Sequence, residues 1–464
     1  MSAGRKLFAC VDVGTTKIKL SLYDGELTRT YAESARVPVA ADGLQDAEEL
    51  FAVVKHMLTK GQELGARSAG IATYRASALA WDREGKPLTP IVTWTDRSVY
   101  ATYRKLPSYL KLMGKVPPLD LVISAYSPVM KFLRLRELNP NMADGRMEWT
   151  LDAYLAYRLT RRFVSDATNA CLTGIIDPRS MKPIGLVRSL FGLKTPLPEL
   201  VENTQNIGSF GGLEINAMIG DQQAASVAEG ATVRGVAKVT NGTGTFVDVP
   251  TDGFKRRGDL IPLVLLKHRG RVCFGLEGYL PTTGRAVDLM IEMGILRDYS
   301  ELEVTDDGDV LFLPALSGLQ VPKLPWARGL IAGLDMGSDR KSIVSGLLKS
   351  ISFHVKLVLA QAGEEVKTLR ADGGLSGSDA LLRRISGATG LEVRRNSDPE
   401  ATSRGLAVLQ MASLGLGSLE SLVSAGMREE VFSGRDYPKQ QAEYAKWKKL
   451  MDLLRSSKGS FLAE

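Results

Sequence analysis

A short pattern occurs twice in the chain and constrains the fold more than any other feature. Near the N-terminus the sequence reads "VDVGTTKIKL", and about 230 residues later it reads "VTNGTGTFVDV". In both places a glycine–threonine turn joins two β-rich runs, which is the pattern of a β-hairpin. The recurrence predicts two domains built on one plan, residues 1–230 and 231–464, with the boundary near Glu229 to Arg234.

Length and composition agree with two globular domains. At 464 residues the chain exceeds the size at which a single core keeps growing. Hydrophobic residues make up 44% and charged residues 24%, an ordinary soluble composition. We find no apolar run near the roughly 20 residues of a membrane span, and the N-terminal segment passes into a strand pattern without a cleavage site. We therefore expect a cytoplasmic protein with no membrane partner.

The net charge of +7 favours anionic partners, and nucleic acid is one candidate. The basic residues are dispersed, however, and the densest group, residues 437–459, has the spacing of an amphipathic helix. We expect no nucleic acid, whereas an anionic small molecule such as a nucleotide fits the charge. The three cysteines and three histidines are scattered, so the chemistry is expected to use carboxylates, hydroxyls and backbone amides.

Strand and helix patterns are mixed along both halves. Alternation predicts strands at 31–39, 272–276 and 310–313 beside the two hairpins, and 3.6-residue periodicity predicts helices. The expected helices cover 47–64, 99–138 and 149–159, with two more beginning near 341 and 380. The predicted fold class is therefore α/β.

The first turn has the groups that a phosphate site needs. A glycine-bearing turn offers backbone N–H donors, and Thr15 and Thr16 add hydroxyls. Lys17 and Lys19 add positive charge, and Asp12 at the strand end is placed to hold Mg²⁺ through water. A glycine–threonine turn by itself is more often only structural, so the case depends on its occurring twice.

The second turn, with Gly242 and Thr243, repeats this arrangement in the other half. A further glycine pair, Gly373 and Gly374, lies between a strand-like and a helical segment, where backbone can approach a flat ring and Ser378 can hydrogen-bond it. The chain contains neither "GxxxxGK[ST]" nor a complete dinucleotide fingerprint, which disfavours P-loop and Rossmann chemistry.

Asp221 lies in the segment "MIGDQQAA", after a glycine and before a helical pattern. That position is typical of a helix N-cap. A carboxylate at a helix start is also rigidly placed and kept ionised by the helix N-terminus, so a chemical role is compatible with the cap.

Nine blocks of the sequence occur in an order that resembles the FGGY carbohydrate kinases, and glycerol kinases most of all. They include "VDVGTTKIKLSLYD", "TWTDRS", "AYSPVMKFL", "SDATNA", "IGDQQAA", "VTNGTGTFV" and "LRADGGLSGSDALL". The resemblance implies two duplicated actin-like ATPase (ribonuclease H-like) domains with a cleft between them. It also implies transfer of the γ-phosphoryl group of ATP to a hydroxyl of glycerol or a related polyol or sugar, with Mg²⁺ as cofactor. In such enzymes the first domain carries the substrate side and the second the nucleotide side, and a homodimer is one assembly to consider.

The resemblance assigns roles residue by residue. Asp221 would be the general base and Asp12 would lie by the metal. The implied substrate-binding residues are Arg75, Trp94, Tyr126, Asp221, Gln222 and Phe246. The implied ATP-binding residues are Thr15, Thr16, Lys17, Lys19, Gly242, Thr243, Gly284, Asp288, Gly373, Gly374 and Ser378.

Two departures from the glycerol kinase pattern leave alternatives open. Ala76 stands where a glutamate would bind substrate hydroxyls, and Asp288 stands where glutamine is usual. An alanine accepts no hydrogen bond, so the substrate could instead be a longer polyol or a sugar, as in xylulokinases. "WTDR" at residues 94–97 is similar to the "WxDxR" of sugar-specific members. A catalytically degenerate ATP-binding regulator is the other alternative, and retention of "GDQQAA" disfavours a chaperone-type ATPase.

Overall fold

The computed structural model describes residues 6–116, 119–124, 127–142, 144–304, 308–425, 427–434 and 440–457. The chain divides into two compact units. The first comprises Met1–Ala228, Leu263–Val272 and Thr402–Gly426, and the second comprises Glu229–Pro262, Cys273–Ala401 and Met427–Glu464. The chain thus leaves the first unit after Ala228 and returns to it twice.

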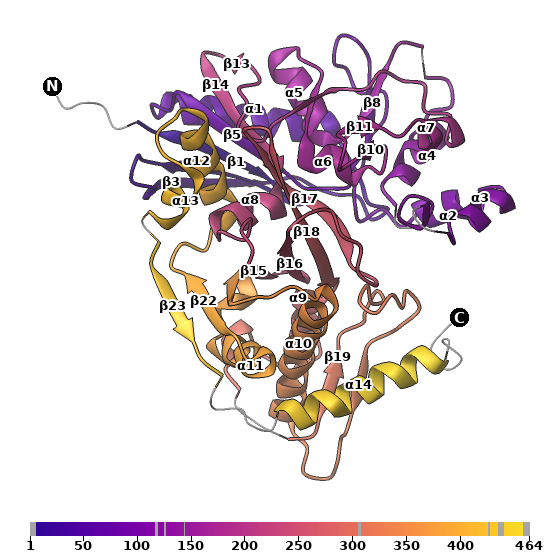
Figure 1. The fold of residues 1–464 in the computed structure, drawn as a ribbon, viewed down its shortest axis with the longest axis vertical. Helices are drawn as coiled ribbons and strands as arrows, with labels where there is room; N and C mark the ends of the chain where they lie inside the picture. The colour runs from indigo at the N-terminus through magenta and orange to yellow at the C-terminus, as the bar shows by residue number, and fades with distance from the viewer. Residues whose placement is uncertain are drawn as a thin grey trace. The chain divides into compact units, whose positions relative to one another are not determined.

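The first unit is built on a six-stranded sheet in the order β13-β14-β5-β1-β2-β3 (Figure 1). The central strands β14, β5 and β1 run parallel, while β1, β2 and β3 are antiparallel neighbours. The bounds are β1 Phe8–Val13, β2 Lys17–Tyr23, β3 Arg29–Arg36, β5 Ser68–Thr73, β13 Ser209–Phe210 and β14 Leu213–Gly220.

Smaller ladders and helices complete this unit. The two-stranded ladders are β4 Leu44–Gln45 with β7 Ile91–Val92, β6 Leu79–Trp81 with β8 Met147–Trp149, β9 Val164–Asp166 with β12 Glu199–Val201, and β10 Ile176–Asp177 with β11 Lys182–Pro183. The helices are α1 Ala47–Glu63, α2 Val99–Arg104, α3 Ser108–Met113, α4 Val129–Leu138, α5 Leu151–Thr160, α6 Ala167–Leu172, α7 Gly185–Leu190, α8 Asp221–Ala228, α12 Ala401–Ser413 and α13 Leu419–Ser424.

Helix α12 lies against β1 and β5 although it comes from the far end of the sequence (Figure 1). The buried side chain of Gln410 accepts a hydrogen bond from the Ser68 hydroxyl at 2.8 Å and donates to the Ala9 carbonyl at 3.1 Å. Gly405 fits directly over α8, because a Cβ there would lie 1.9 Å from the Ala224 carbonyl oxygen. The first unit therefore needs this late segment to cover its sheet.

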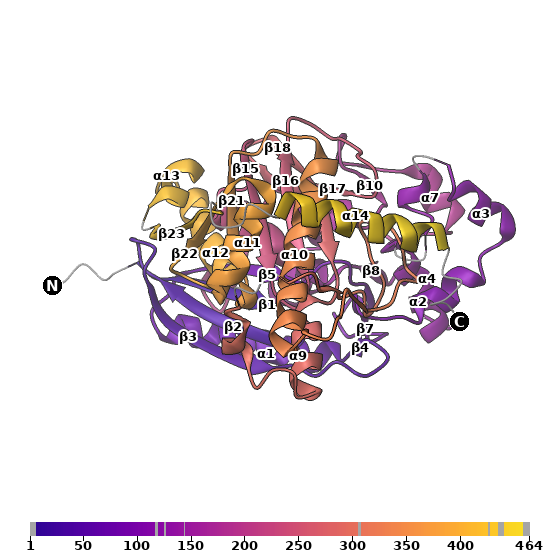
Figure 2. The same cartoon turned by 90° about the horizontal axis from the view of Figure 1, so that it is seen from below.

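The second unit is built on a seven-stranded sheet in the order β17-β18-β16-β15-β21-β22-β23, although β17 from Leu263 onward is grouped with the first unit. Helices α10, α11 and α14 lie over one face of it (Figure 2). The strands are β15 Val236–Asn241, β16 Thr245–Thr251, β17 Ile261–His268, β18 Arg271–Leu280, β21 Thr368–Asp372, β22 Glu392–Asn396 and β23 Glu429–Phe432, with the separate pair β19 Leu311–Leu313 and β20 Leu330–Ala332. The helices are α9 Thr283–Glu292, α10 Arg340–Ala362, α11 Asp379–Thr389 and α14 Gln440–Ser457.

The two sheets repeat one plan. The order β14-β5-β1-β2-β3 of the first corresponds to β22-β21-β15-β16-β18 of the second, with three parallel strands followed by an antiparallel meander. The two turns singled out in the sequence join β1 to β2 and β15 to β16. The predicted hairpins are therefore confirmed.

Other sequence predictions need correction. The helical stretch expected at 99–138 is divided into α2, α3, a short 3₁₀ turn Leu119–Leu121 and α4. Pro107 precedes α3 and Gly114 ends it, as expected because proline lacks the N–H that continues a helix. Trp149 belongs to β8 rather than to the helix expected to start there, and α5 begins at Leu151.

Helix α10 begins at Arg340, in agreement with the helix expected near 341, and it is more apolar than its sequence pattern indicated. Arg340–Ala362 is long and apolar enough to cross a membrane by length and composition. However, 72% of its most apolar stretch is buried inside the second unit, as in the core helix of a folded domain. Its buried residues include Leu347, Ile351 and Val355. The apolar side chains of α10 therefore pack in the core of this unit.

Candidate functional site

Three parallel strands of the first unit end level with one another. Gly220 at the end of β14 pairs with Thr73 of β5, and Thr73 pairs with Val13 of β1. The residues that follow these strands therefore leave the sheet at one edge. In open α/β sheets ligands bind at this carboxyl edge of the strands. The sequence-predicted residues Asp221, Arg75 and Thr15 all follow these strand ends.

Asp221 and Arg75 form a partly buried ion pair at this edge. Arg75 Nε lies 3.7 Å from Asp221 Oδ1, and the two side chains are 12% and 26% exposed. Asp221 is the first residue of α8, and its Oδ1 accepts the N–H of Gln222 at 2.7 Å. The helix N-terminus and the guanidinium both favour the charged carboxylate. The pair is suited to hold a hydroxyl group and accept its proton.

A buried hydrogen-bond network fixes the backbone just before Asp221. The N–H of Gly220 donates to the Thr168 hydroxyl at 2.9 Å, and that hydroxyl donates to Asp166 Oδ1 at 2.5 Å. Asp166 also caps α6, since Oδ1 accepts the N–H groups of Thr168 and Asn169 at 2.8 and 3.1 Å. The start of α8 is thereby tied to the start of α6.

A second buried carboxylate supports this network from behind. Asp152 accepts hydrogen bonds from the hydroxyls of Thr150 and Ser165 and from the N–H of Asp166. Burial, together with the nearby charge of Asp166, raises the pKa of Asp152 to about 8. Burial likewise raises the pKa of Asp166. Because both are fully buried and already hydrogen-bonded, they position neighbours and do not meet a ligand.

The first turn is held from two sides. Gln45 Nε2 donates to the Thr15 carbonyl at 2.9 Å, and Trp94 Nε1 donates to Thr15 Oγ1 at 2.8 Å. The Thr16 carbonyl accepts the N–H of Val37 at 3.0 Å. Trp94 is 47% exposed, so its N–H is anchored while the indole remains open to solvent. This tryptophan therefore is not a core residue.

Asp12 lies one residue before the end of β1. It is half-buried and pairs across the hairpin with Lys19, while Lys17 begins β2 with an exposed side chain. Among the described residues no group of three or more His, Cys, Asp and Glu is placed to hold a metal ion. Within that part of the chain a metal at Asp12 would thus have at most two such side chains as ligands, which suits Mg²⁺ because this ion keeps several waters and substrate phosphates as ligands.

In the second unit the corresponding turn is packed against a helix start. The N–H of Gly242 donates to the Gly244 carbonyl at 2.9 Å, and the N–H of Gly284 donates to the Thr243 carbonyl at 3.0 Å. A Cβ on Gly284 would lie 2.6 Å from the Gly242 carbonyl oxygen. Only glycine permits this close approach of α9 to the turn.

The glycine pair after β21 completes this backbone-lined region. Gly373 has φ +85°, and a Cβ there would lie 2.5 Å from the Asn241 carbonyl oxygen. The buried amide of Asn241 donates to Ser376 Oγ at 3.0 Å and accepts from Thr245 Oγ1 at 3.0 Å. Asn241 therefore links the turn, the glycine pair and the following 3₁₀ turn, which includes Gly374.

The remaining predicted residues of the second unit have partners of their own. Phe246, the second residue of β16, stacks on Tyr279 with centroids 5.1 Å apart. Asp288 accepts the Tyr299 hydroxyl at 2.6 Å, and burial together with this carboxylate raises the pKa of Tyr299 to about 12. Ser378 caps α11. The predicted residue Tyr126 lies outside the described residues.

Sequence reasoning missed Thr168 and Asn241 as parts of the site. Both lie inside motifs that were noticed, "SDATNA" and "NGTGT". The aspartate followed by threonine in the first motif is a helix-cap signal. The contact from Thr168 to Gly220 spans 52 residues, however, and no local pattern encodes it.

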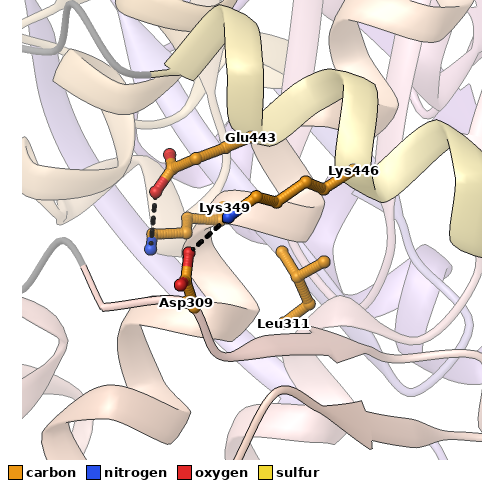
Figure 3. Close-up of a pocket in the computed structure, with 5 residues that line it drawn as sticks. All are labelled: Asp309, Leu311, Lys349, Glu443 and Lys446. Atoms are coloured by element: carbon orange, nitrogen blue, oxygen red, sulfur yellow. Dashed lines mark hydrogen bonds and ion pairs between the residues drawn. The ribbon is translucent and has the colours of Figure 1, made fainter.

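The second unit contains a pocket that is too small for a ligand. Asp309, Leu311, Lys349, Glu443 and Lys446 line a volume of about 10 Å³, which holds about one water molecule (Figure 3). Lys349 pairs with Glu443 at 3.0 Å, and Lys446 pairs with Asp309 at 2.8 Å. These ion pairs attach α14 to its neighbours and leave no room for a ligand.

Comparisons with known proteins identify the family of the chain. The model of the FGGY family of carbohydrate kinases, N-terminal domain, matches residues 7–233, and that of the C-terminal domain matches residues 237–414. A protein from Archaeoglobus fulgidus, described as an uncharacterized sugar kinase, is 27% identical over 97% of this chain and 100% of its own. Glycerol kinase from Coxiella burnetii strain RSA 331 is 29% identical over 95% of this chain and 96% of its own.

The fold is shared with a solved kinase. The crystal structure of Plasmodium falciparum glycerol kinase with ADP superposes with a TM-score of 0.88 at 23% identity, covering 97% of this chain and 98% of that one. This likeness confirms the predicted actin-like fold of two duplicated α/β domains. Together with the family models and the glycerol kinase relatives, this fold identifies a sugar or polyol kinase that uses ATP and a small-molecule acceptor. The chain belongs to the FGGY family of carbohydrate kinases.

Proposed function

We propose that this kinase transfers the γ-phosphoryl group of ATP to a hydroxyl of glycerol or a related polyol or sugar, with Asp221 as the general base. The observation that carries the proposal is the ion pair of Asp221 and Arg75 at the level ends of β14 and β5. Asp221 accepts the proton of the attacking hydroxyl, and Arg75 orients the acceptor by donating to its oxygens. Gln222 and Trp94 contribute further contacts to the acceptor.

The turns supply the donors for the phosphate groups. Thr15 and Thr16, with Lys17 and Lys19, face the transferred group from the first unit, as proposed from the residue types. In the second unit the backbone near Gly242, Thr243, Gly284, Gly373 and Gly374 takes the nucleotide, which is supported by the close packing at Gly284 and Gly373. Charge on the transferred group is stabilised by positioned donors, since phosphoryl transfer depends on positioning and electrostatics.

We propose Mg²⁺ as the cofactor, held through Asp12. The half-buried carboxylate of Asp12, next to the last residue of β1, fits an ion that takes most of its ligands from water and phosphate. When bound, Mg²⁺ neutralises charge on the phosphate oxygens. Asp12 fixes its position relative to the first turn, and Lys19 lies across the hairpin from Asp12.

The identity of the acceptor depends on the segment after β5. Ala76 has φ +53° and replaces a side chain that could accept two hydrogen bonds from glycerol. Glycerol is one candidate because the Coxiella relative is named for it, and a longer polyol or sugar is the other.

One assay tests the proposal. Purified full-length protein with Mg-ATP should release ADP in the presence of glycerol, a pentitol, a ketopentose or a hexonate, and product should form in equal amount. Failure of every acceptor, with ATP binding intact in calorimetry, would favour the alternative of an ATP-binding regulator. Two observations favour this alternative. Asp288 already accepts a hydrogen bond from Tyr299, and position 76 has an alanine in place of a carboxylate.

A further inference from the structure

The first unit contains a hollow whose lining residues have no role in the proposed phosphoryl transfer. Ala41, Asp42, Thr95, Arg97 and Ser98 line a volume of about 370 Å³. This volume lies near the lower end of the range for small-molecule pockets, about 300–1,000 Å³. The hollow is therefore large enough for part of a carbohydrate, in contrast to the water-sized pocket beside α14.

The two walls of the hollow are fixed to each other. One wall is the loop before β4, and the other is the loop after β7. Thr93 Oγ1 donates to the Gly43 carbonyl at 2.8 Å, and a Cβ on Gly43 would lie 2.5 Å from the backbone of Asp96. Gly43 has φ +83°, which glycine adopts without strain. The backbones of the two loops are thus in direct contact, and the hollow is preformed.

Both walls are also tied to the strand edge that carries Asp221 and Arg75. Gln45, just after the first wall, accepts the hydroxyl of Tyr74 at 2.8 Å and donates to the Thr15 carbonyl at 2.9 Å. Trp94, just before Thr95 in the second wall, donates to the Thr15 hydroxyl at 2.8 Å. Since Tyr74 is the residue before Arg75, the hollow flanks the region proposed for the acceptor.

The polar groups of the hollow match a chain of hydroxyl groups. Asp42 uses Oδ1 to accept the Leu44 N–H at 3.1 Å, and its carboxylate has capacity for further donors. The Arg97 side chain is exposed and forms no ion pair with any residue that the structure describes. The Ser98 hydroxyl is buried and has no hydrogen-bond partner within the described ranges. A carboxylate, a guanidinium and hydroxyls together can satisfy both the donors and the acceptors of a polyol.

We propose that this hollow is a subsite for the distal hydroxyls of an acceptor with five or six carbons, with Asp42 and Arg97 as its specificity-determining residues. The inference rests on the proposed kinase function and names the substrate class of that site. A phosphate or carboxylate group is a poorer occupant, because Asp42 would repel it. Asp42 thus provides a carboxylate in this hollow, in a chain that has alanine at position 76.

The test compares acceptors that differ in length. kcat/KM is measured for glycerol, erythritol, xylitol and D-xylulose with the wild type, Asp42→Asn, Arg97→Ala and the control Arg104→Ala. Arg104 is an exposed arginine of α2 that does not line the hollow. We expect the wild type to prefer the five-carbon acceptors. Asp42→Asn and Arg97→Ala should each raise KM for these acceptors about tenfold, the effect of losing one hydrogen bond to a charged group, and leave glycerol and kcat within about twofold. Arg104→Ala should match the wild type.

Three results would overturn the subsite. One is a wild type that prefers glycerol, the second is an equal change for short and long acceptors in the two variants, and the third is no change at all. If the wild type phosphorylates none of the acceptors, the proposed function fails, and calorimetric titration of xylitol and glycerol into the same proteins decides the subsite separately. Xylitol binding that weakens in Arg97→Ala supports the subsite, and absence of xylitol binding by the wild type rejects it.

Discussion

The two units use the same strand order but place different groups at the strand ends. In the first unit, β5 is followed by Arg75 and β14 by Asp221, so the edge presents charged side chains. In the second unit, β21 is followed by Gly373 and Gly374, and the turn after β15 packs on Gly284, so the edge presents backbone. A duplicated scaffold can thus offer proton chemistry on one copy and a close-fitting binding surface on the other.

The difference predicts how each unit responds to substitution. In the first unit, activity should be lost when one functional group is replaced by another of the same shape. In the second unit, binding should be lost when a side-chain atom is added to a glycine. Four experiments test this contrast, and they follow in order of decreasing expected effect.

Asp221→Asn should lower kcat by about 10²- to 10⁴-fold, because the amide cannot accept the proton of the acceptor hydroxyl. The Kd for ATP should stay within about twofold, since Asp221 is assigned to the acceptor and not to the nucleotide. Steady-state kinetics and calorimetry with full-length protein measure the two quantities. Turnover equal to that of the wild type would remove Asp221 from the role of base.

Gly373→Ala should weaken ATP binding at least tenfold and lower the free energy of unfolding by about 2 kcal/mol or more. The added Cβ would meet the Asn241 carbonyl oxygen at 2.5 Å, and φ +85° is strained for alanine. The matched control is Gly390→Ala, which has φ +75° but no atom within 4 Å of the added Cβ. The control should lose about 1 kcal/mol and keep its affinity for ATP. Equal loss of ATP affinity in both variants would mean that strain, not crowding of the nucleotide surface, is responsible.

Thr168→Val should lower kcat about tenfold, because the Gly220 N–H would lose its acceptor and Asp221 its fixed position. Thr173→Val is the control, since Thr173 is equally buried at the end of the same helix and bonds only locally, to Ala170 and Ile175. Both variants should unfold more easily, but only the first should lose turnover. A similar kcat in the two variants would reduce the network to a purely structural role.

The smallest effect concerns pH and has opposite signs in the two units. Asp152 in α5 has its pKa raised to about 8, so it holds a proton that the unfolded chain releases near pH 4. Its contribution to stability is therefore present below pH 4 and is lost as the pH rises to 8, by at most about 1.4 kcal/mol per pH unit. Burial lowers the pKa of His354 in α10 to about 4, so the second unit loses stability as the pH falls from about 6.5 to 4.

Hydrogen exchange followed by mass spectrometry can read the two helices separately. After correction for the intrinsic exchange rate, protection of α5 should fall between pH 6.5 and 8, and protection of α10 should fall between pH 6.5 and 5. Asp152→Asn should flatten the first dependence and leave the second. Protection of α5 that increases with pH would show that the hydrogen bonds to Asp152 outweigh its burial.

Local features were predictable from sequence because they depend on neighbouring residues. The two hairpins follow from alternation around "GTT" and "GTG", and α1 follows from its periodicity, with the expected 47–64 close to Ala47–Glu63. The helix at 99–138 failed as one element because proline and glycine outweigh apolar periodicity. The length and composition of α10 would also suit a membrane span, and its burial in the folded chain identifies it as a core helix.

The duplicated plan, the family and the residue types at the turns can be read from the sequence, because short ordered motifs encode them. The contacts between distant residues appear only in the folded chain. The register of β14, β5 and β1 brings Asp221 beside Arg75, and the Thr168 hydroxyl reaches Gly220 across 52 residues. The fold also gave Trp94 an anchored N–H with an exposed ring, where composition alone allowed a core residue. Such contacts depend on strand pairing and burial, and no window of neighbouring residues contains that information.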